Sequence, residues 1–260
     1  MNDMFNQCSS LRTVTLFDTS KCTNMGSMFT NCAFETVPLY NTSRVTNMIY
    51  MFNGCTNLKE VPLFNLSNYN KELSEMFYSC TSLTTIPQFN TSKVTNMRYM
   101  FYSCTSLTSV PQLDTSKVTN MEYMFNGCTS LTTIEGLNLI KITNQSYVNS
   151  MFNRCTSLTN LTLSNIKVNL TIGSGSSYGH NLTIESLLNT CQECINVSAS
   201  RTLTIGSANI TKLADVYVKL TGEPEVDSTL PKLPMVQCES TDEGAMTIQE
   251  YMTLKNWTIA

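Results

Sequence analysis

Apolar residues recur along the first two thirds of the chain with the regular period of a structural repeat. The motif Met-Phe-x-x-Cys ends at Cys8, Cys32, Cys55, Cys80, Cys104, Cys128 and Cys155, and its copies follow one another at intervals of about 23 to 27 residues. Residues 81–101 and 105–125 align almost position for position. Because no single copy can bury its Leu, Val, Met and Phe alone, the pattern predicts about seven coils stacked over residues 1–165.

Each copy contains the pattern of two short strands and a closing turn. Apolar positions three apart, as in Leu83 and Ile86, lie among Ser and Thr and are followed by a proline, which cannot donate to a ladder and ends the strand. A second strand fits residues 94–97, and Met100 with Phe101 closes the coil with a helical turn. The side chains expected to point inward are Leu83, Ile86, Val94, Met97 and Phe101. A period of about 20–29 residues with leucine at fixed positions is typical of a leucine-rich-repeat solenoid.

An Asp or Asn stands at the corner between the two strands of most copies. These residues are Asp18, Asn41, Asn65, Asn90, Asp114 and Asn138. Their side chains are short enough to accept a hydrogen bond from their own backbone two residues on. The corner is therefore predicted to be a turn that the side chain itself stabilises.

The pattern changes after residue 165, and residues 166–260 are predicted to form a small α+β capping unit with degenerate repeats and helices. Leu170-Thr-Ile-Gly and Leu203-Thr-Ile-Gly echo each other, and residues 184–195, 210–220 and 246–254 have the apolar spacing of helices. A terminal unit of different sequence that covers the open end of the core is what a solenoid requires. At the other end the chain begins in the middle of a repeat, so either removed upstream repeats or a neighbouring subunit is expected to cover the first coil.

Composition narrows the class of partner. Charged residues make up only 13% of the chain, the formal net charge is −3, and Ser, Thr and Asn make up about a third of the residues. Such a surface suits neutral ligands or protein surfaces, whereas a nucleic-acid interface needs a strong positive field. No apolar run approaches the length of a membrane span, and residues 1–8 lack the regions of a signal peptide. We therefore expect neither a nucleic-acid partner nor membrane insertion.

Candidate chemistry is sparse. The seven motif cysteines are expected to form a buried column of small apolar side chains, with disulfide bonds between neighbouring coils as the alternative. Cys191 and Cys194 share the apolar face of a predicted helix, so core packing is favoured over a metal or redox role. The single histidine, His180, lies in a Gly- and Ser-rich loop, and no nucleophile elbow or phosphate loop is present. The sequence predicts no catalytic residue, metal or cofactor, and hence no enzyme.

Two ladders of repeated side chains are the candidate ligand-binding residues. Tyr78 and Tyr102 occupy one position of the repeat, and Tyr99 and Tyr123 occupy another. Tyrosine offers stacking area with a polar tip, which suits sugars and protein interfaces, although packing against the next coil explains the pattern as well. Lys93 and Lys117 belong to a basic column that either holds acidic groups or forms a solvated edge.

The repeat closely resembles the BspA-type leucine-rich repeats. The resemblance lies in Cys-Thr-Ser-Leu-Thr-x-[Ile/Val]-Pro followed by Asn-Thr-Ser-Lys-Val-Thr-Asn-Met-x-Tyr-Met-Phe, and it covers about residues 1–165. It implies a surface protein of host-associated microbes or a tail or fibre protein of a gut bacteriophage. The expected function is a non-enzymatic recognition or adhesion module that binds a protein or glycan on a cell surface. A structural component of a phage tail or other virion part is the alternative.

Overall fold

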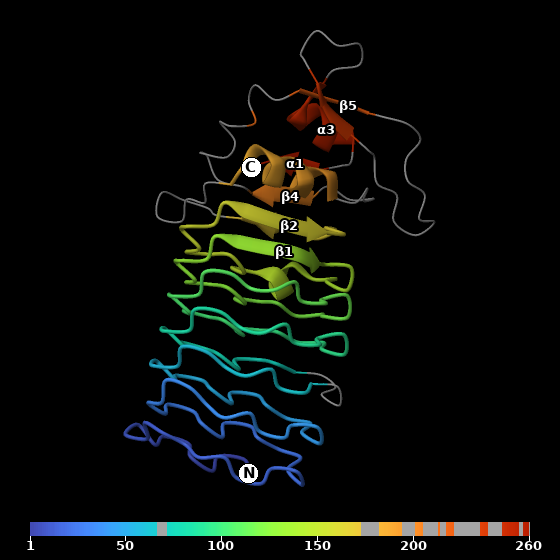
Figure 1. Cartoon of the computed structure of the whole chain (residues 1–260). Helices are drawn as coiled ribbons and strands as arrows, with labels where there is room; N and C mark the ends of the chain where they lie inside the picture. Colours follow the sequence, from blue (N-terminus) through green and yellow to red (C-terminus); the bar gives the residue numbers. More distant parts are fainter. Residues whose placement is uncertain are drawn as a thin grey trace.

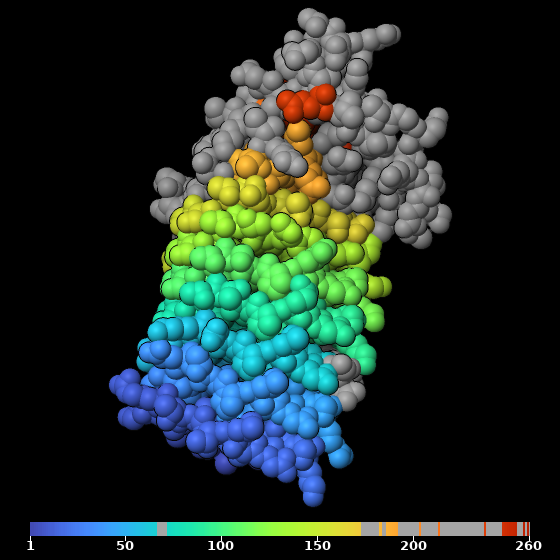
Figure 2. Space-filling view, in the orientation of Figure 1, coloured from blue at the N-terminus to red at the C-terminus, as the bar shows by residue number. Residues whose placement is uncertain are grey.

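The computed structural model describes residues 1–66, 72–172, 182–193, 201–204, 213, 217–220, 235–238, 246–254 and 257–259. Successive copies of the repeat form coils that stack along one axis, from the N-terminus to a C-terminal unit of helices and short strands (Figure 1). In the space-filling view the coils form consecutive bands in contact with each other (Figure 2). In the described part of the chain, no helix has the length and apolar character to cross a membrane.

Backbone hydrogen bonds join each coil to the next along the segment that contains Met-Phe. The amides of Met97, Tyr99, Phe101 and Ser103 donate to the carbonyls of Asn120, Glu122, Met124 and Asn126, at 2.9, 3.0, 2.9 and 2.7 Å respectively. Every second amide thus points to the following coil, while the amides between them close turns within the coil, as from Met100 to the carbonyl of Met97 at 3.2 Å. Two positions of the segment, Tyr99 and Ser103, have left-handed φ angles of 55° and 56°. The segment expected to be a helical turn is therefore a run of tight turns.

Regular strands appear only toward the C-terminal end of the described stack. The first parallel pair is β1 (Thr133–Asn138) with β2 (Asn160–Ser164). A second parallel sheet has the order β3-β4-β8, formed by β3 (Leu170–Thr171), β4 (Arg201–Thr204) and β8 (Trp257–Ile259). An antiparallel sheet has the order β6-β5-β7, formed by β5 (Tyr217–Leu220), β6 (Met235–Cys238) and β7 (Met246–Thr247). The helices are η1 (Gln145–Val148), α1 (Ile184–Glu193) and α3 (Ile248–Leu254).

The expected strands of the earlier coils are reduced to isolated contacts. Asn96 bridges in parallel to Asn120, and Ser109 to Thr133, without extending into a strand on both sides. The two Leu-Thr-Ile segments of the C-terminal unit do pair, with Leu170 opposite Leu203 in β3 and β4. Similar sequences thus lie side by side in this region as well.

The core is a column of side chains from every coil. The five residues expected to point inward are buried: Leu83, Ile86, Val94, Met97 and Phe101 are each at most 4% exposed. That prediction is confirmed. The equivalent residues one repeat later are also buried, and Phe101 stacks on Phe125 with ring centroids 5.6 Å apart and planes 6° apart.

The cysteine of each motif after the first has a defined partner in the coil before it. The thiol of Cys104 lies 3.0 Å from the carbonyl oxygen of Phe77, and that of Cys128 lies 3.0 Å from the carbonyl of Phe101. Among the described residues the cysteines with a described environment are all free thiols, so no disulfide joins these coils. The prediction of a buried column is wrong for Cys8, which is exposed. Cys8 belongs to the first coil, so no earlier coil of the structure packs against it.

The corner residues act as expected. The side-chain oxygen of Asp114 accepts the amide of Ser116 at 3.0 Å, and that of Asn90 accepts the amide of Ser92 at 3.2 Å. Hydrogen bonds from the Ser116 hydroxyl and amide lower the pKa of Asp114, and Lys117 adds to this effect. The corner turns are therefore stabilised by their own side chains.

The C-terminal unit departs from the predicted helices in two places. Residues 217–220 were expected at the end of a helix, but they form β5, which pairs with β6 and β7. Residues 246–247 form β7, so α3 begins only at Ile248. Pairing with distant strands outweighs the local helical spacing here. The expected helix from residue 184 is α1, with Cys191 buried, whereas His180 and Cys194 lie outside the described residues.

Candidate functional site: a tyrosine cluster on the coil surface

The four predicted tyrosines come together on three consecutive coils. Tyr78 stacks on Tyr102 with centroids 4.7 Å apart and planes 7° apart. Tyr99 stacks on Tyr123 at 4.8 Å and 2°. These separations are close to the spacing of neighbouring strands, because equivalent residues of adjacent coils lie directly above one another. We call Tyr78, Tyr99, Tyr102 and Tyr123 the tyrosine cluster.

The two stacks of the cluster also contact each other. The ring of Tyr99 lies 5.5 Å from that of Tyr102 in an edge arrangement, and 6.1 Å from that of Tyr78. Tyr102 in turn lies 6.4 Å from Tyr123. All four side chains are partly exposed, and burial raises the pKa of the Tyr78 and Tyr99 hydroxyls. The cluster is therefore one continuous aromatic surface, and the phenol groups of Tyr78 and Tyr99 are protonated at neutral pH.

The backbone of the cluster is strained. Tyr99 and Tyr123 have φ angles of 55° and 56°, in the left-handed region where a residue with a large side chain is disfavoured by about 1–3 kcal/mol. The same position of two other coils holds smaller residues, Ser27 and Ser150, at similar φ. Tyrosine at this position therefore does not favour the backbone conformation. Its contribution comes from the side chain and the surface that the side chain presents.

Charged groups lie along one side of the cluster. The guanidinium carbon of Arg98 lies 4.4 Å from the centre of the Tyr99 ring, a cation–π contact. Arg98 Nε donates to Glu122 Oε2 at 2.7 Å. In the coil before, Glu75 accepts a hydrogen bond from Asn53 at 3.3 Å, and burial raises the pKa of its carboxyl group. The aromatic surface thus has both a cation and carboxylates within reach of a ligand that stacks on it.

The predicted lysines are not part of this surface. Lys93 and Lys117 are exposed at the corner turns, six residues before Tyr99 and Tyr123. Lys117 acts on Asp114, whose pKa it helps to lower. This arrangement fits the interpretation of the basic column as a solvated edge beside the corner carboxylates and amides.

Arg98, Glu122 and Glu75 were missed by the sequence analysis. The signal was present, because Arg98 and Glu122 are one repeat apart and therefore occupy the same position in adjacent coils. Opposite charges at equivalent positions of a stacked repeat are brought together by the stacking alone. Among the described residues no group of three or more His, Cys, Asp or Glu side chains has the arrangement of a metal site.

Comparison with known proteins gives one match. Residues 1–85 and 71–174 match the model of a family described as "Mycoplasma protein of unknown function, DUF285". The two matches overlap and together span all the Met-Phe-x-x-Cys coils. No curated protein and no solved structure matches the chain.

Proposed function

The chain belongs to the DUF285 family, whose function is unknown, and from its tyrosine cluster we propose that it is a non-enzymatic recognition or adhesion module for a protein or glycan on a cell surface. The observation that carries the proposal is the stacking of Tyr78 on Tyr102 beside Tyr99 on Tyr123. A single coil offers one or two rings, whereas three stacked coils offer a surface large enough for an extended ligand.

The chemistry of the cluster supports this class of ligand. Tyrosine is enriched at binding hot spots because it combines a large apolar face with a polar tip. Stacking on neighbours fixes the rings before a ligand arrives, so little side-chain entropy remains to be lost on binding. Arg98 and Glu122 at the side of the cluster supply charged hydrogen-bonding groups that orient a bound partner.

The proposed fold class and location belong with this function. We take the stacked coils to be a leucine-rich-repeat solenoid of the BspA type, displayed outside the cell on a bacterial surface or on a phage virion. The observations in favour are the regular spacing of the Met-Phe-x-x-Cys motif, the core column of Leu, Met and Phe, and the low charge of the surface. An exposed face that repeats along a rigid stack suits the binding of large partners outside a cell.

The test is a binding screen with matched variants. Purified wild-type protein is applied to arrays of glycans and of host cell-surface proteins. The variant Tyr99→Ala/Tyr123→Ala should lose most of the signal on the ligands that the wild type binds. Tyr147 is 39% exposed and lies outside the cluster, so Tyr147→Ala is the control and should bind as the wild type does. Equal binding by the cluster variant and the control would refute the proposed site.

One observation favours the alternative, a structural component of a phage tail or other virion part. Leu16, Leu39 and Leu63 occupy the same position of three consecutive coils and are 66, 60 and 57% exposed. A column of exposed leucines is a feature of assembly surfaces. The mass of the native particle separates the two functions, because a recognition module is stable as a monomer whereas an assembly component is expected to associate through this column.

A further inference from the structure

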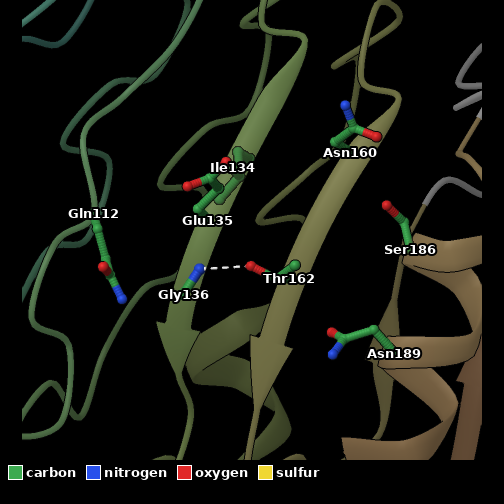
Figure 3. A pocket seen from close by; sticks show the side chains of 8 residues that line it. All are labelled: Gln112, Ile134, Glu135, Gly136, Asn160, Thr162, Ser186 and Asn189. Atoms are coloured by element: carbon green, nitrogen blue, oxygen red, sulfur yellow. Dashed lines mark hydrogen bonds between the residues drawn. The ribbon is translucent and has the colours of Figure 1, made fainter.

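A hollow of about 490 Å³ lies where the last coils meet α1. It opens at Gly136 in β1, which occupies the position held by Leu63, Gln88 and Gln112 in three earlier coils. Figure 3 shows the side chains of β1, β2 and α1 around this space. Gly136 has a φ angle of +69°, and a Cβ atom there would lie 2.6 Å from Nε2 of Gln112. The missing side chain at this position therefore creates the space.

The lining of the hollow is almost entirely polar. It comprises the carboxylate of Glu135, the amides of Gln112, Asn160 and Asn189, and the hydroxyls of Thr162 and Ser186. The only apolar side chain that lines it is that of Ile134, and no Lys, Arg or His is among the described lining residues. These groups come from two coils, from β2 and from α1, so the stack and its C-terminal unit build the hollow together.

Several of the lining groups are held in place by the protein. Thr162 Oγ1 accepts the amide of Gly136 at 2.7 Å, and Ser186 Oγ accepts the amide of Leu161 at 3.1 Å. Asn189 is different: its Oδ1 atom is buried, and within the described part of the chain no donor lies within hydrogen-bond distance of it. A buried amide oxygen without a partner costs about 1–3 kcal/mol, which a ligand donor would offset.

We propose that this hollow is a binding site for a neutral sugar, of the size of a mono- or disaccharide. Sugar hydroxyls both donate and accept, which matches a lining of amides, hydroxyls and one carboxylate. A phosphate or sulfate group would face Glu135 with no cation among the described lining residues, and an apolar ligand would leave the lining amides unpaired. The volume of the hollow is in the ordinary range of small-ligand sites.

The site deepens the proposed recognition function by naming a ligand class, and it rests on that function only in the premise that the chain binds ligands. The hollow and the tyrosine cluster share no lining residue. Each can therefore be removed by substitution while the other is left intact.

The experiment is saturation-transfer NMR on the whole chain with lactose, maltose, cellobiose and N,N′-diacetylchitobiose at millimolar concentration. At least one disaccharide should bind, and Gln112→Ala and Asn189→Leu should each weaken it about fivefold or more. Gln88 holds the same position one coil earlier and does not line the hollow, so Gln88→Ala is the matched control and should change the affinity less than twofold. Circular dichroism should show the same fold in all variants.

The remaining outcomes separate the two sites. Tyr99→Ala/Tyr123→Ala should leave the affinity for the disaccharide unchanged, and a loss in that variant alone would move sugar binding to the tyrosine cluster and overturn this proposal. Spermidine and glucose 6-phosphate serve as cationic and anionic probes. Binding of spermidine but of none of the disaccharides, or a lack of any disaccharide binding at 20 mM, would equally overturn it, whereas the array result for the cluster would stand.

Discussion

The same three coils carry two aromatic stacks that differ in what they contact. Phe77, Phe101 and Phe125 stack inside the coils with centroids 5.7 and 5.6 Å apart, and each is 0% exposed. Tyr78 and Tyr102, the residues next to Phe77 and Phe101, stack on the outside at 4.7 Å and remain partly exposed. One repeat thus produces both a core and a surface of rings. The comparison indicates that the inner stack stabilises the coils while the outer stack is available to a ligand.

Alkaline pH should break the inner column most strongly. Burial raises the pKa of the Cys55 and Cys155 thiols from 9.0 to about 12, and it raises those of Cys80, Cys104 and Cys128 as well. The folded chain therefore keeps protons that the unfolded chain loses. Stability is fully present below pH 9 and falls as the pH rises toward 12, by on the order of 1 kcal/mol for each thiol per pH unit.

The measurement is the urea midpoint followed by circular dichroism at pH 8, 9 and 10. We expect a steep fall above pH 9. The variant Cys80→Ala/Cys104→Ala should show a smaller fall over the same range, although it is less stable at pH 8. A wild-type midpoint that is constant to pH 10 would contradict the burial of the thiols.

Phe77→Ala should be the most damaging single substitution among the aromatic residues compared here. The ring lies between Phe52 and Phe101, at 5.7 Å from each, and is fully buried. Removing a buried phenylalanine costs about 3–5 kcal/mol through lost burial and the cavity left behind. Urea denaturation measures the loss, and a change smaller than that of an exposed substitution such as Tyr147→Ala would show that the inner stack contributes little.

The corresponding change in the outer stack should be small. Tyr78→Ala/Tyr102→Ala removes a stacked pair of partly exposed rings, and such a pair is worth about 0.5–1.5 kcal/mol beyond the area it buries. The midpoint should therefore shift much less than for Phe77→Ala. A loss as large as that of Phe77→Ala would mean that the tyrosines belong to the core.

The smallest effect is expected from the lysine column. Lys93→Ala/Lys117→Ala removes exposed charges, and exposed ion pairs contribute at most about 1 kcal/mol. Stability should be almost unchanged, and any effect on ligand binding should disappear above about 0.1 M salt, where charges are screened beyond about 10 Å. Thermal melts and binding at two salt concentrations test this, and a loss of binding that persists at high salt would place the lysines in the site.

Periodicity made the inner and outer stacks predictable. Residues one repeat apart must lie above one another in a stacked array, so the inward set around Phe101 and the pairing of Tyr78 with Tyr102 follow from spacing alone. The backbone path did not follow, because apolar spacing carries no information on the sign of φ at Tyr99 and Ser103. The strand at Tyr217–Leu220 was missed because its partners β6 and β7 are distant in sequence.

The hollow at Gly136 was also beyond the sequence. A glycine in a column of leucine and glutamine is visible as a missing side chain, but the space it leaves depends on what faces it. Here Ser186 and Asn189 of α1 form part of the lining. The position of that helix over the last coils is a tertiary feature that no local pattern determines.

The account depends most on whether a ligand recognises the tyrosines as a stacked set. The most direct test measures the affinity of wild type, Tyr78→Ala, Tyr102→Ala and the double variant for the strongest ligand from the arrays. The double variant should lose more than either single variant, by about tenfold or more relative to wild type, with circular dichroism unchanged, because linked weak contacts act together. Four equal affinities would contradict the account and make the outer stack part of the scaffold.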